Sequence, residues 1–117
     1  MTIDLYGIPN CDTVRKARRW LKQHAVAYTF HDYKREGVAA ELLVRAAEVL
    51  GWEALLNRRG TTWRKLDAAE RADVDCLQAL QLMQNHPSLI KRPLLLMDGQ
   101  PRMVGFVEED YAELFTR

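Results

Sequence analysis

The hydrophobic period of the chain changes twice within residues 1–33. Ile3–Tyr6 alternates apolar and polar side chains, as a half-buried strand does. Residues 12–24 then follow the period of an amphipathic helix, and Val26–Tyr33 returns to a strand-like pattern. The apolar face of the helix comprises Val14, Ala17, Trp20 and Leu21. These patterns predict a strand, a helix and a second strand in succession, as at the start of an α/β fold.

A strand hairpin follows near the end of the chain. Leu94–Met97 is an apolar run, Asp98-Gly99 is a hairpin signal, and Arg102–Phe106 is the partner strand. The remaining elements that we expect are helices at Ala39–Leu50, Thr62–Lys65, Ala68–Asn85 and Glu108–Phe115, and a turn at Leu55–Gly60. This order, β-α-β-α…α-β-β-α, is that of the α/β thioredoxin-like fold, a small mixed sheet covered by helices. We expect a single domain over residues 1–117, with an inserted helical region at about 37–86.

Composition narrows the classes of protein and partner. The 117 residues carry 17 basic and 16 acidic side chains, a net charge of +1, which argues against a dedicated nucleic-acid or membrane-surface protein. The N-terminus has no basic segment followed by an apolar one, and the longest apolar run, Leu94–Met97, is too short to span a bilayer. Neither cysteine has a histidine at metal-ligand spacing. We expect a cytoplasmic monomer with no bound metal or cofactor.

Cys11 stands directly before the first predicted helix. Unpaired backbone N–H groups converge at such a position, and the helix dipole favours negative charge there. Arg15 follows one turn later, so we expect a lowered thiol pKa and a nucleophilic thiolate. The same N–H groups suit an oxyanion or carboxylate, which makes Asn10, Asp12, Thr13 and Arg15 candidate anion-binding residues. The alternative is that Cys11 is a small buried residue at a loop–helix junction.

A second thiol is missing from the predicted site. Val14 occupies the place at which a C-x-x-C motif has its second cysteine. Cys76 falls inside the long predicted helix near Leu77 and Leu80, so we expect it to be a core or semi-buried residue. A single thiol that has formed a mixed disulfide must be released by another thiol, from glutathione or from a protein cysteine.

Two further segments concentrate basic residues. Asn57–Leu66 places Arg58, Arg59, Arg64 and Lys65 around a glycine turn, and Arg92 precedes Pro93 at the mouth of a buried-type strand. Arginine suits forked hydrogen bonding to a carboxylate or oxyanion. Most such side chains are solvated surface charges, but Arg92 stands where its neighbours are expected to be buried.

Four separated segments, "LYGIPNCDTVRKARRWL", "LLNRRGTTWRKL", "HPSLIKRPLL" and "MVGF", resemble the arsenate reductase-related ArsC/Spx family, in particular its YffB-like subgroup. The resemblance extends from about Ile3 to Phe115. It implies a thioredoxin-like fold with an inserted helical region, a nucleophile at Cys11, and a cis bond between Arg92 and Pro93. It also implies that glutathione and glutaredoxin resolve the adduct that the cysteine forms.

The arginines that bind the oxyanion in arsenate reductases match only in part. Arg92 corresponds to the second of these three arginines. Asn57 stands where the first is expected, and the resemblance implies that Arg59 substitutes for it, as in Spx-like members. Gly105 takes the place of the third. The loss of one ligand argues against arsenate as the natural substrate and leaves the thiol chemistry intact.

The leading hypothesis is an enzyme, a glutathione-dependent thiol-disulfide oxidoreductase. Cys11 would act as the nucleophile, with Arg59 and Arg92 positioning an anionic group and Pro93 shaping the site. Its expected partners are glutathione and either glutaredoxin or an oxidised protein thiol. Two alternatives stay open: an arsenate reductase that uses the same cysteine, and an Spx-like regulator that binds RNA polymerase through surface contacts.

Overall fold

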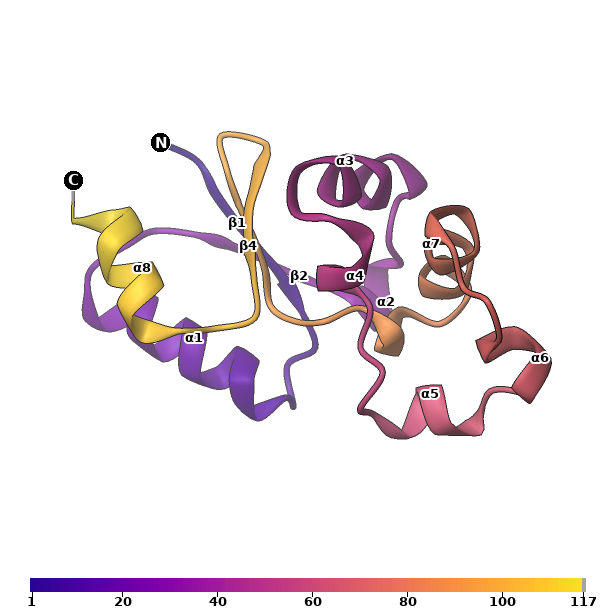
Figure 1. Ribbon diagram of the computed structural model, residues 1–117. Helices are drawn as coiled ribbons and strands as arrows, with labels where there is room; N and C mark the ends of the chain where they lie inside the picture. The colour runs from indigo at the N-terminus through magenta and orange to yellow at the C-terminus, as the bar shows by residue number, and fades with distance from the viewer. Residues whose placement is uncertain (117) are drawn as a thin grey trace. The chain divides into compact units, whose positions relative to one another are not determined.

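The computed structural model describes residues 1–116, which fold as two compact units (Figure 1). One unit, here called the sheet unit, comprises Met1–Asp32 and the chain from Arg92 onward. The other, the helical unit, comprises Tyr33–Lys91. The expected insertion at about 37–86 falls inside the helical unit.

The sheet unit contains all four strands of a mixed sheet. Its elements are β1 (Ile3–Gly7), α1 (Asp12–Gln23), β2 (Thr29–Asp32), β3 (Leu94–Met97), β4 (Gln100–Val104) and α8 (Glu108–Phe115). The strand order is β2-β1-β3-β4, with β1 parallel to β2 and antiparallel to β3, and β3 antiparallel to β4. The predicted α/β class and mixed sheet are confirmed. The register that matters for the site pairs Tyr6 of β1 with Leu94 of β3.

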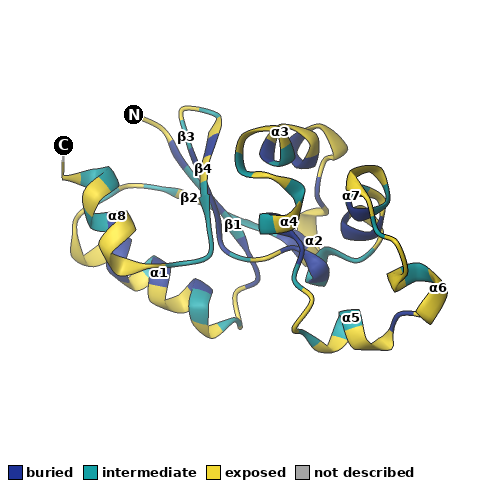
Figure 2. Cartoon of the chain, viewed as in Figure 1, coloured by how far each residue is buried: buried dark blue, intermediate teal, exposed yellow. Residues whose placement is uncertain are grey.

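The core of the sheet unit lies between the sheet and its two helices. Alternate residues of β1 are buried, and one stripe of α1 is buried while its other side is exposed (Figure 2). The core cluster comprises Ile3, Leu5, Ala17, Trp20, Leu21, Leu95 and Tyr111. Because these side chains come from β1, β3, α1 and α8, α1 is held firmly against the central strand.

The helical unit is a cluster of short helices. Its elements are α2 (Tyr33–Glu36), α3 (Ala40–Leu50), α4 (Trp52–Leu55), α5 (Thr61–Lys65), α6 (Ala68–Arg71), α7 (Cys76–Asn85) and a 3₁₀ turn, η1 (Pro87–Leu89). Helix α3 contacts α4 and α7. An isolated antiparallel bridge pairs Leu56 with Ile90. Backbone hydrogen bonds from Asn57 to Leu89 and from Lys91 to Leu55 flank this bridge and join the segment after α4 to the segment after η1. The sequence did not predict α2 or α4.

The long helix predicted at Ala68–Asn85 is wrong, because the structure divides it into α6 and α7. Asp73 adopts a left-handed backbone conformation with φ 50°, which a helix cannot contain. The Asp75 side chain then accepts a hydrogen bond of 2.8 Å from the N–H of Gln78 and caps α7. Cys76 is therefore the first residue of a helix and is exposed, which corrects the expectation that it is a core or semi-buried residue.

Two strands differ from their predicted bounds. Strand β2 is shorter than Val26–Tyr33, because it begins at Thr29 and α2 begins at Tyr33. Strand β4 lies nearer the hairpin than Arg102–Phe106. Asp98 and Gly99 both have positive φ, of 52° and 80°, and form a two-residue turn that pairs Met97 directly with Gln100. Gly105, with φ 81°, ends β4.

Candidate functional site

Cys11 is the N-cap residue of α1 and follows the turn after β1. Its backbone N–H donates to the Ile8 carbonyl oxygen at 3.2 Å, which ties it to the loop. Its own carbonyl oxygen accepts the N–H of Arg15 at 2.9 Å, the first bond of the helix. The Cys11 side chain is half-buried. The sequence therefore places a thiol where β1, a tight turn and the N-terminus of α1 meet.

The pKa of the Cys11 thiol lies below its ordinary value. Burial raises it, but the backbone N–H groups of Val14 and Thr13, together with a hydrogen bond and the positive charge of Arg92, lower it by more. The side chain makes no capping hydrogen bond of ordinary geometry. The two amides therefore act on the sulfur chiefly as oriented dipoles. More of this thiol is ionised at neutral pH than of a free cysteine, and the thiolate is the nucleophilic form.

Arg92 reaches this site from the other end of the sheet unit's sequence. It stands two residues before β3, whose first residue, Leu94, is paired with Tyr6 near the end of β1. Pro93 follows through a cis peptide bond, as the family resemblance implies. The Pro93 carbonyl oxygen accepts the N–H of Gly105 at 2.8 Å. The segment before β3 is therefore held by this hydrogen bond to the end of β4 and by the pairing of Leu94 with Tyr6 of β1. The structure thus brings Arg92 and Cys11 together.

Arg15 has a different partner from the one expected. Its guanidinium forms an ion pair with the carboxylate of Asp12, and both side chains are exposed. Arg15 holds the pKa of the Asp12 carboxyl below its usual range. The groups that lower the pKa of Cys11 include Arg92 and two amides but not Arg15. The cation that acts on the sulfur is therefore Arg92, because Asp12 occupies Arg15.

The other candidates near Cys11 have simple surroundings. Thr13 contributes its backbone N–H to the sulfur and is half-buried. Asn10 is exposed in the turn between β1 and α1. The amide of Val14 is the strongest of the groups that lower the thiol pKa. The sequence pattern predicts that Val14 lies on the apolar face of the helix and stands in place of a second thiol, but it does not predict that its amide acts on the sulfur. Its position three residues after the N-cap is the signal that could have identified it.

Arg59 belongs to the helical unit and lines a pocket of ≈ 180 Å³ with Glu53, Leu56, Arg58 and Lys91. Its backbone N–H donates to the Asn57 side-chain oxygen at 3.1 Å. The guanidinium carbon of Arg58 lies 5.7 Å from the ring centre of Trp52 and 5.6 Å from that of Trp63. This pocket suits an anion, but Cys11 lies in the sheet unit. The role of Arg59 toward Cys11 remains a prediction.

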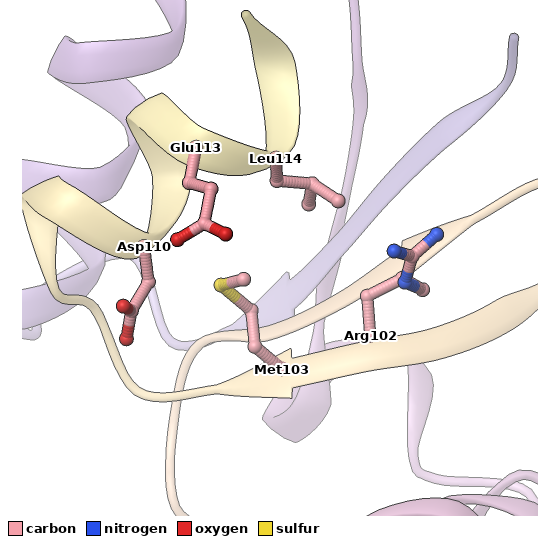
Figure 3. A pocket seen from close by; sticks show the side chains of 5 residues that line it. All are labelled: Arg102, Met103, Asp110, Glu113 and Leu114. Carbon is pink, nitrogen blue, oxygen red and sulfur yellow. The ribbon is translucent and has the colours of Figure 1, made fainter. Parts of the chain in front are cut away.

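The sheet unit also has a pocket, which lies between β4 and α8 (Figure 3). It has a volume of ≈ 230 Å³ and is lined by Arg102, Met103, Asp110, Glu113 and Leu114. The carboxylates of Asp110 and Glu113 come from α8, and Met103 projects from β4 toward them (Figure 3). None of the residues predicted for the site lines this pocket, and we assign it no part in the thiol chemistry.

Residues 1–116 contain no group of three or more histidine, cysteine, aspartate or glutamate side chains arranged to hold a metal ion. Nor does any helix in that range have both the length and the apolar character needed to cross a membrane.

Comparison with known proteins places this site in a family. The model of the ArsC family matches residues 6–114. The solved structure of a protein named YffB is 52% identical, with a TM-score of 0.91, over 96% of this chain and 97% of that one. An arsenate reductase (ArsC) related protein from Brucella melitensis is 50% identical, with a TM-score of 0.77, over 100% of this chain and 97% of that one.

A regulator is also similar to this chain. The global transcriptional regulator Spx 2 of Oceanobacillus iheyensis is 29% identical over 119 residues, which cover 100% of this chain and 86% of that protein. The solved structures confirm the thioredoxin-like α/β fold. Since the family model matches well over half of the chain, residues 6–114, the chain belongs to the ArsC family.

Proposed function

We propose that this protein is a glutathione-dependent thiol reductase of the cytoplasm, acting as a monomer through the single nucleophile Cys11 and without a bound cofactor. The observation that carries the proposal is the sulfur's environment: an N-cap position, two amides of α1 and the guanidinium of Arg92 all stabilise the thiolate. Cys76 is exposed on α7 of the helical unit, where the N-cap residue is Asp75 and not the cysteine.

The reaction consists of two thiol–disulfide exchanges. In the first, the Cys11 thiolate attacks the glutathione sulfur of a mixed disulfide. A bond forms between Cys11 and glutathione, the original S–S bond breaks, and the substrate leaves as a thiolate that takes a proton from water. In the second, the thiolate of another glutathione attacks the Cys11–glutathione disulfide. Oxidised glutathione is released and the Cys11 thiolate is restored. The sum of the two exchanges converts one mixed disulfide and one reduced glutathione into the free substrate thiol and oxidised glutathione.

The arginines would act on charge and position. Arg92 would stabilise Cys11 both as the attacking thiolate and as the leaving group of the second exchange, because the same negative sulfur is present at each stage. A carboxylate of glutathione would bind to Arg59. Glutaredoxin or an oxidised protein thiol could replace a small molecule in either exchange. We expect neither nucleic acid nor a membrane as a partner.

The test compares the two cysteines. Cys11→Ser and Cys76→Ser are assayed with reduced glutathione and a glutathione mixed disulfide, and the formation of oxidised glutathione is followed. We expect Cys11→Ser to lose turnover entirely and Cys76→Ser to keep it. Turnover by Cys11→Ser, or its absence in the unmodified protein, would reject the proposal.

Arsenate reduction at the same cysteine is a less favoured enzymatic candidate. Gly105, which the family resemblance aligns with the third oxyanion-binding arginine, has φ 81°. A residue with a side chain is strained in that conformation, so an arginine would not be readily accommodated there. We expect arsenate to be turned over much more slowly than a glutathione mixed disulfide.

A regulator that binds RNA polymerase is the candidate from another class, and the similarity to Spx 2 over the whole of this chain favours it. Val14 excludes a C-x-x-C switch at the start of α1, so such binding would be independent of oxidation. Purified polymerase, tested for binding to the reduced and the oxidised protein, separates this candidate from the reductase. Equal binding in both states, together with no turnover, would favour the regulator.

A further inference from the structure

Gly7 is the last residue of β1 and packs against the first turn of α1. A Cβ atom built on Gly7 would lie 2.8 Å from Cγ2 of Val14 and 3.4 Å from Cγ1. Carbon atoms do not approach to 2.8 Å without displacement of one of them. The φ angle of Gly7 is not positive, so the backbone itself would accept another residue. Glycine is therefore required at position 7 because a side chain there would collide with Val14, and not because of the backbone conformation.

Val14 cannot easily make room. Its side chain is fully buried, with an exposed fraction of 0%, and it is β-branched within a helix, where one side-chain rotamer is strongly preferred. A Cβ at residue 7 would consequently push the first turn of α1 away from β1. The displaced turn would take with it the N–H groups of Val14 and Thr13.

The groups around the sulfur come from two elements that this contact holds together. The amides of Val14 and Thr13 belong to α1. Arg92 instead follows the sheet, through the pairing of Leu94 with Tyr6. Cys11 is hydrogen-bonded to the loop after β1 and to α1. Its N–H donates to the carbonyl oxygen of Ile8, and its own carbonyl oxygen accepts the N–H of Arg15, the first hydrogen bond of the helix. The distance between β1 and the first turn thus decides whether both sets of groups reach one sulfur.

We propose that Gly7 is a positioning residue for Cys11, whose missing side chain lets the first turn of α1 approach β1 closely enough for the amides of Val14 and Thr13 to act on the same sulfur as Arg92. This inference rests on the proposed function of Cys11 as a thiolate nucleophile. Gly7 touches no substrate and acts only through Val14.

The experiment measures the thiol pKa of Cys11 without any substrate, from the pH dependence of iodoacetamide labelling and of thiolate absorbance. All variants carry Cys76→Ser, so that a single thiol is observed. We expect Gly7→Ala to raise the pKa by roughly half a unit or more toward the value of ~8.5 of a free cysteine. Val14→Ala alone is measured beside it and gives the effect of removing the two methyl groups without a Cβ atom at residue 7.

The decisive variant is Gly7→Ala/Val14→Ala, in which the clashing methyl groups are gone and the first turn can return to β1. We expect its pKa to match that of the Cys76→Ser reference. Gly60→Ala is the matched control. There the added Cβ would meet the Nδ2 of Asn57 at 3.0 Å, the free end of a flexible side chain in the helical unit, so the pKa of Cys11 should not change.

A merely structural role for Gly7 would lower the melting temperature of Gly7→Ala and leave the pKa as in the reference, which would overturn the inference. A double variant that unfolds, or that keeps a raised pKa, would also overturn it. If Gly7→Ala alone does not fold, a double variant with the reference pKa still supports it. An ordinary pKa in the reference itself would reject the proposed function as well, whereas a low reference pKa unaffected by Gly7→Ala rejects only this inference.

Discussion

Two helices of this chain begin beside a cysteine, α1 at Cys11 and α7 at Cys76. Cys11 is the N-cap residue, with an extended backbone, and the amides two and three residues further along act on its sulfur. Cys76 stands one position later, inside the helix. There the N-cap is Asp75, whose carboxylate accepts the N–H of Gln78. One residue of register decides whether a thiol or a carboxylate receives the unpaired amides of a helix.

The acidic neighbour also differs between the two helix starts. Asp75 is the cap itself and takes an amide of α7. Asp12 follows the N-cap of α1 and forms an ion pair with Arg15, so the amides at the start of α1 act on Cys11 and not on a carboxylate. A cation from outside the helix, Arg92, completes the first site. Cys11 thus combines the cap position of a helix with a neighbouring cation, and each of these lowers the pKa of a thiol.

The largest expected effect comes from removing each of the two thiols in turn and comparing the turnover rates. Glutathione-dependent turnover should disappear in Cys11→Ser and remain within about twofold in Cys76→Ser, because Cys11 has the cap position and is stabilised as a thiolate by Arg92. Alkylation with iodoacetamide followed by peptide mass spectrometry would show which thiol reacts first at pH 7. Preferential labelling of the exposed Cys76 would contradict the comparison.

Loss of the cation should have the next largest effect. Arg92→Gln removes a positive charge that stabilises the thiolate, so the thiol pKa should rise and the acid limb of the rate profile should move to higher pH. Below both pKa values, the thiolate fraction falls about tenfold for each unit by which the pKa rises. The pH dependence of alkylation measures this shift.

Arg92→Lys is the matched control for that variant, since it keeps the charge and loses the fork. Its pKa should lie between those of the native protein and Arg92→Gln. An unchanged pKa in Arg92→Gln would mean that the amides of α1 alone determine the reactivity of Cys11.

The sequence predicted what depends on local period and missed what depends on pairing. The bounds of β3 and α8 follow from an apolar run and an acidic first turn, and both agree with the structure to the residue. Cys11 was found from its position before a helix. The sequence did not show that Arg92, and not Arg15, is the cation that acts on the Cys11 sulfur. That outcome depends on the pairing of Leu94 with Tyr6 and on the ion pair between Asp12 and Arg15.

The break between α6 and α7 shows the same limit for the second cysteine. The helical spacing of apolar residues continues through Ala72–Asp75, and period alone therefore predicts one helix. Two aspartates decide otherwise, Asp73 by a left-handed backbone and Asp75 by capping. Asp near a helical pattern favours caps and turns, and that signal was available in the sequence.

A smaller effect is expected from removing the cap of α7. Asp75→Ala should lower the free energy of unfolding by about 1 kcal/mol, the usual cost of losing an N-cap side chain. Chemical denaturation measures it. The thiol pKa of Cys11 and the turnover rate should not change. A change in either would indicate that the start of α7 contributes to the Cys11 site, and the distinction between the two helix starts would fail.

The smallest expected effect concerns the Asp12–Arg15 pair. Asp12→Asn removes the negative charge of the residue next to Cys11 in the chain and also releases Arg15 from its ion pair, and both changes should favour the thiolate. The pKa of Cys11 should therefore fall further, by about a few tenths of a unit, because exposed charges are strongly screened by solvent. The shift should shrink when the alkylation profile is repeated at high ionic strength.

A double variant separates the two causes of that shift. Asp12→Asn/Arg15→Gln still lacks the carboxylate but has no released cation, so its pKa should lie between those of the native protein and Asp12→Asn. A pKa equal to that of Asp12→Asn would assign the whole effect to the carboxylate. A pKa that rises in Asp12→Asn would mean that Asp12 supports the thiolate by holding the first turn in place, which would give the two aspartates at the two helix starts the same role.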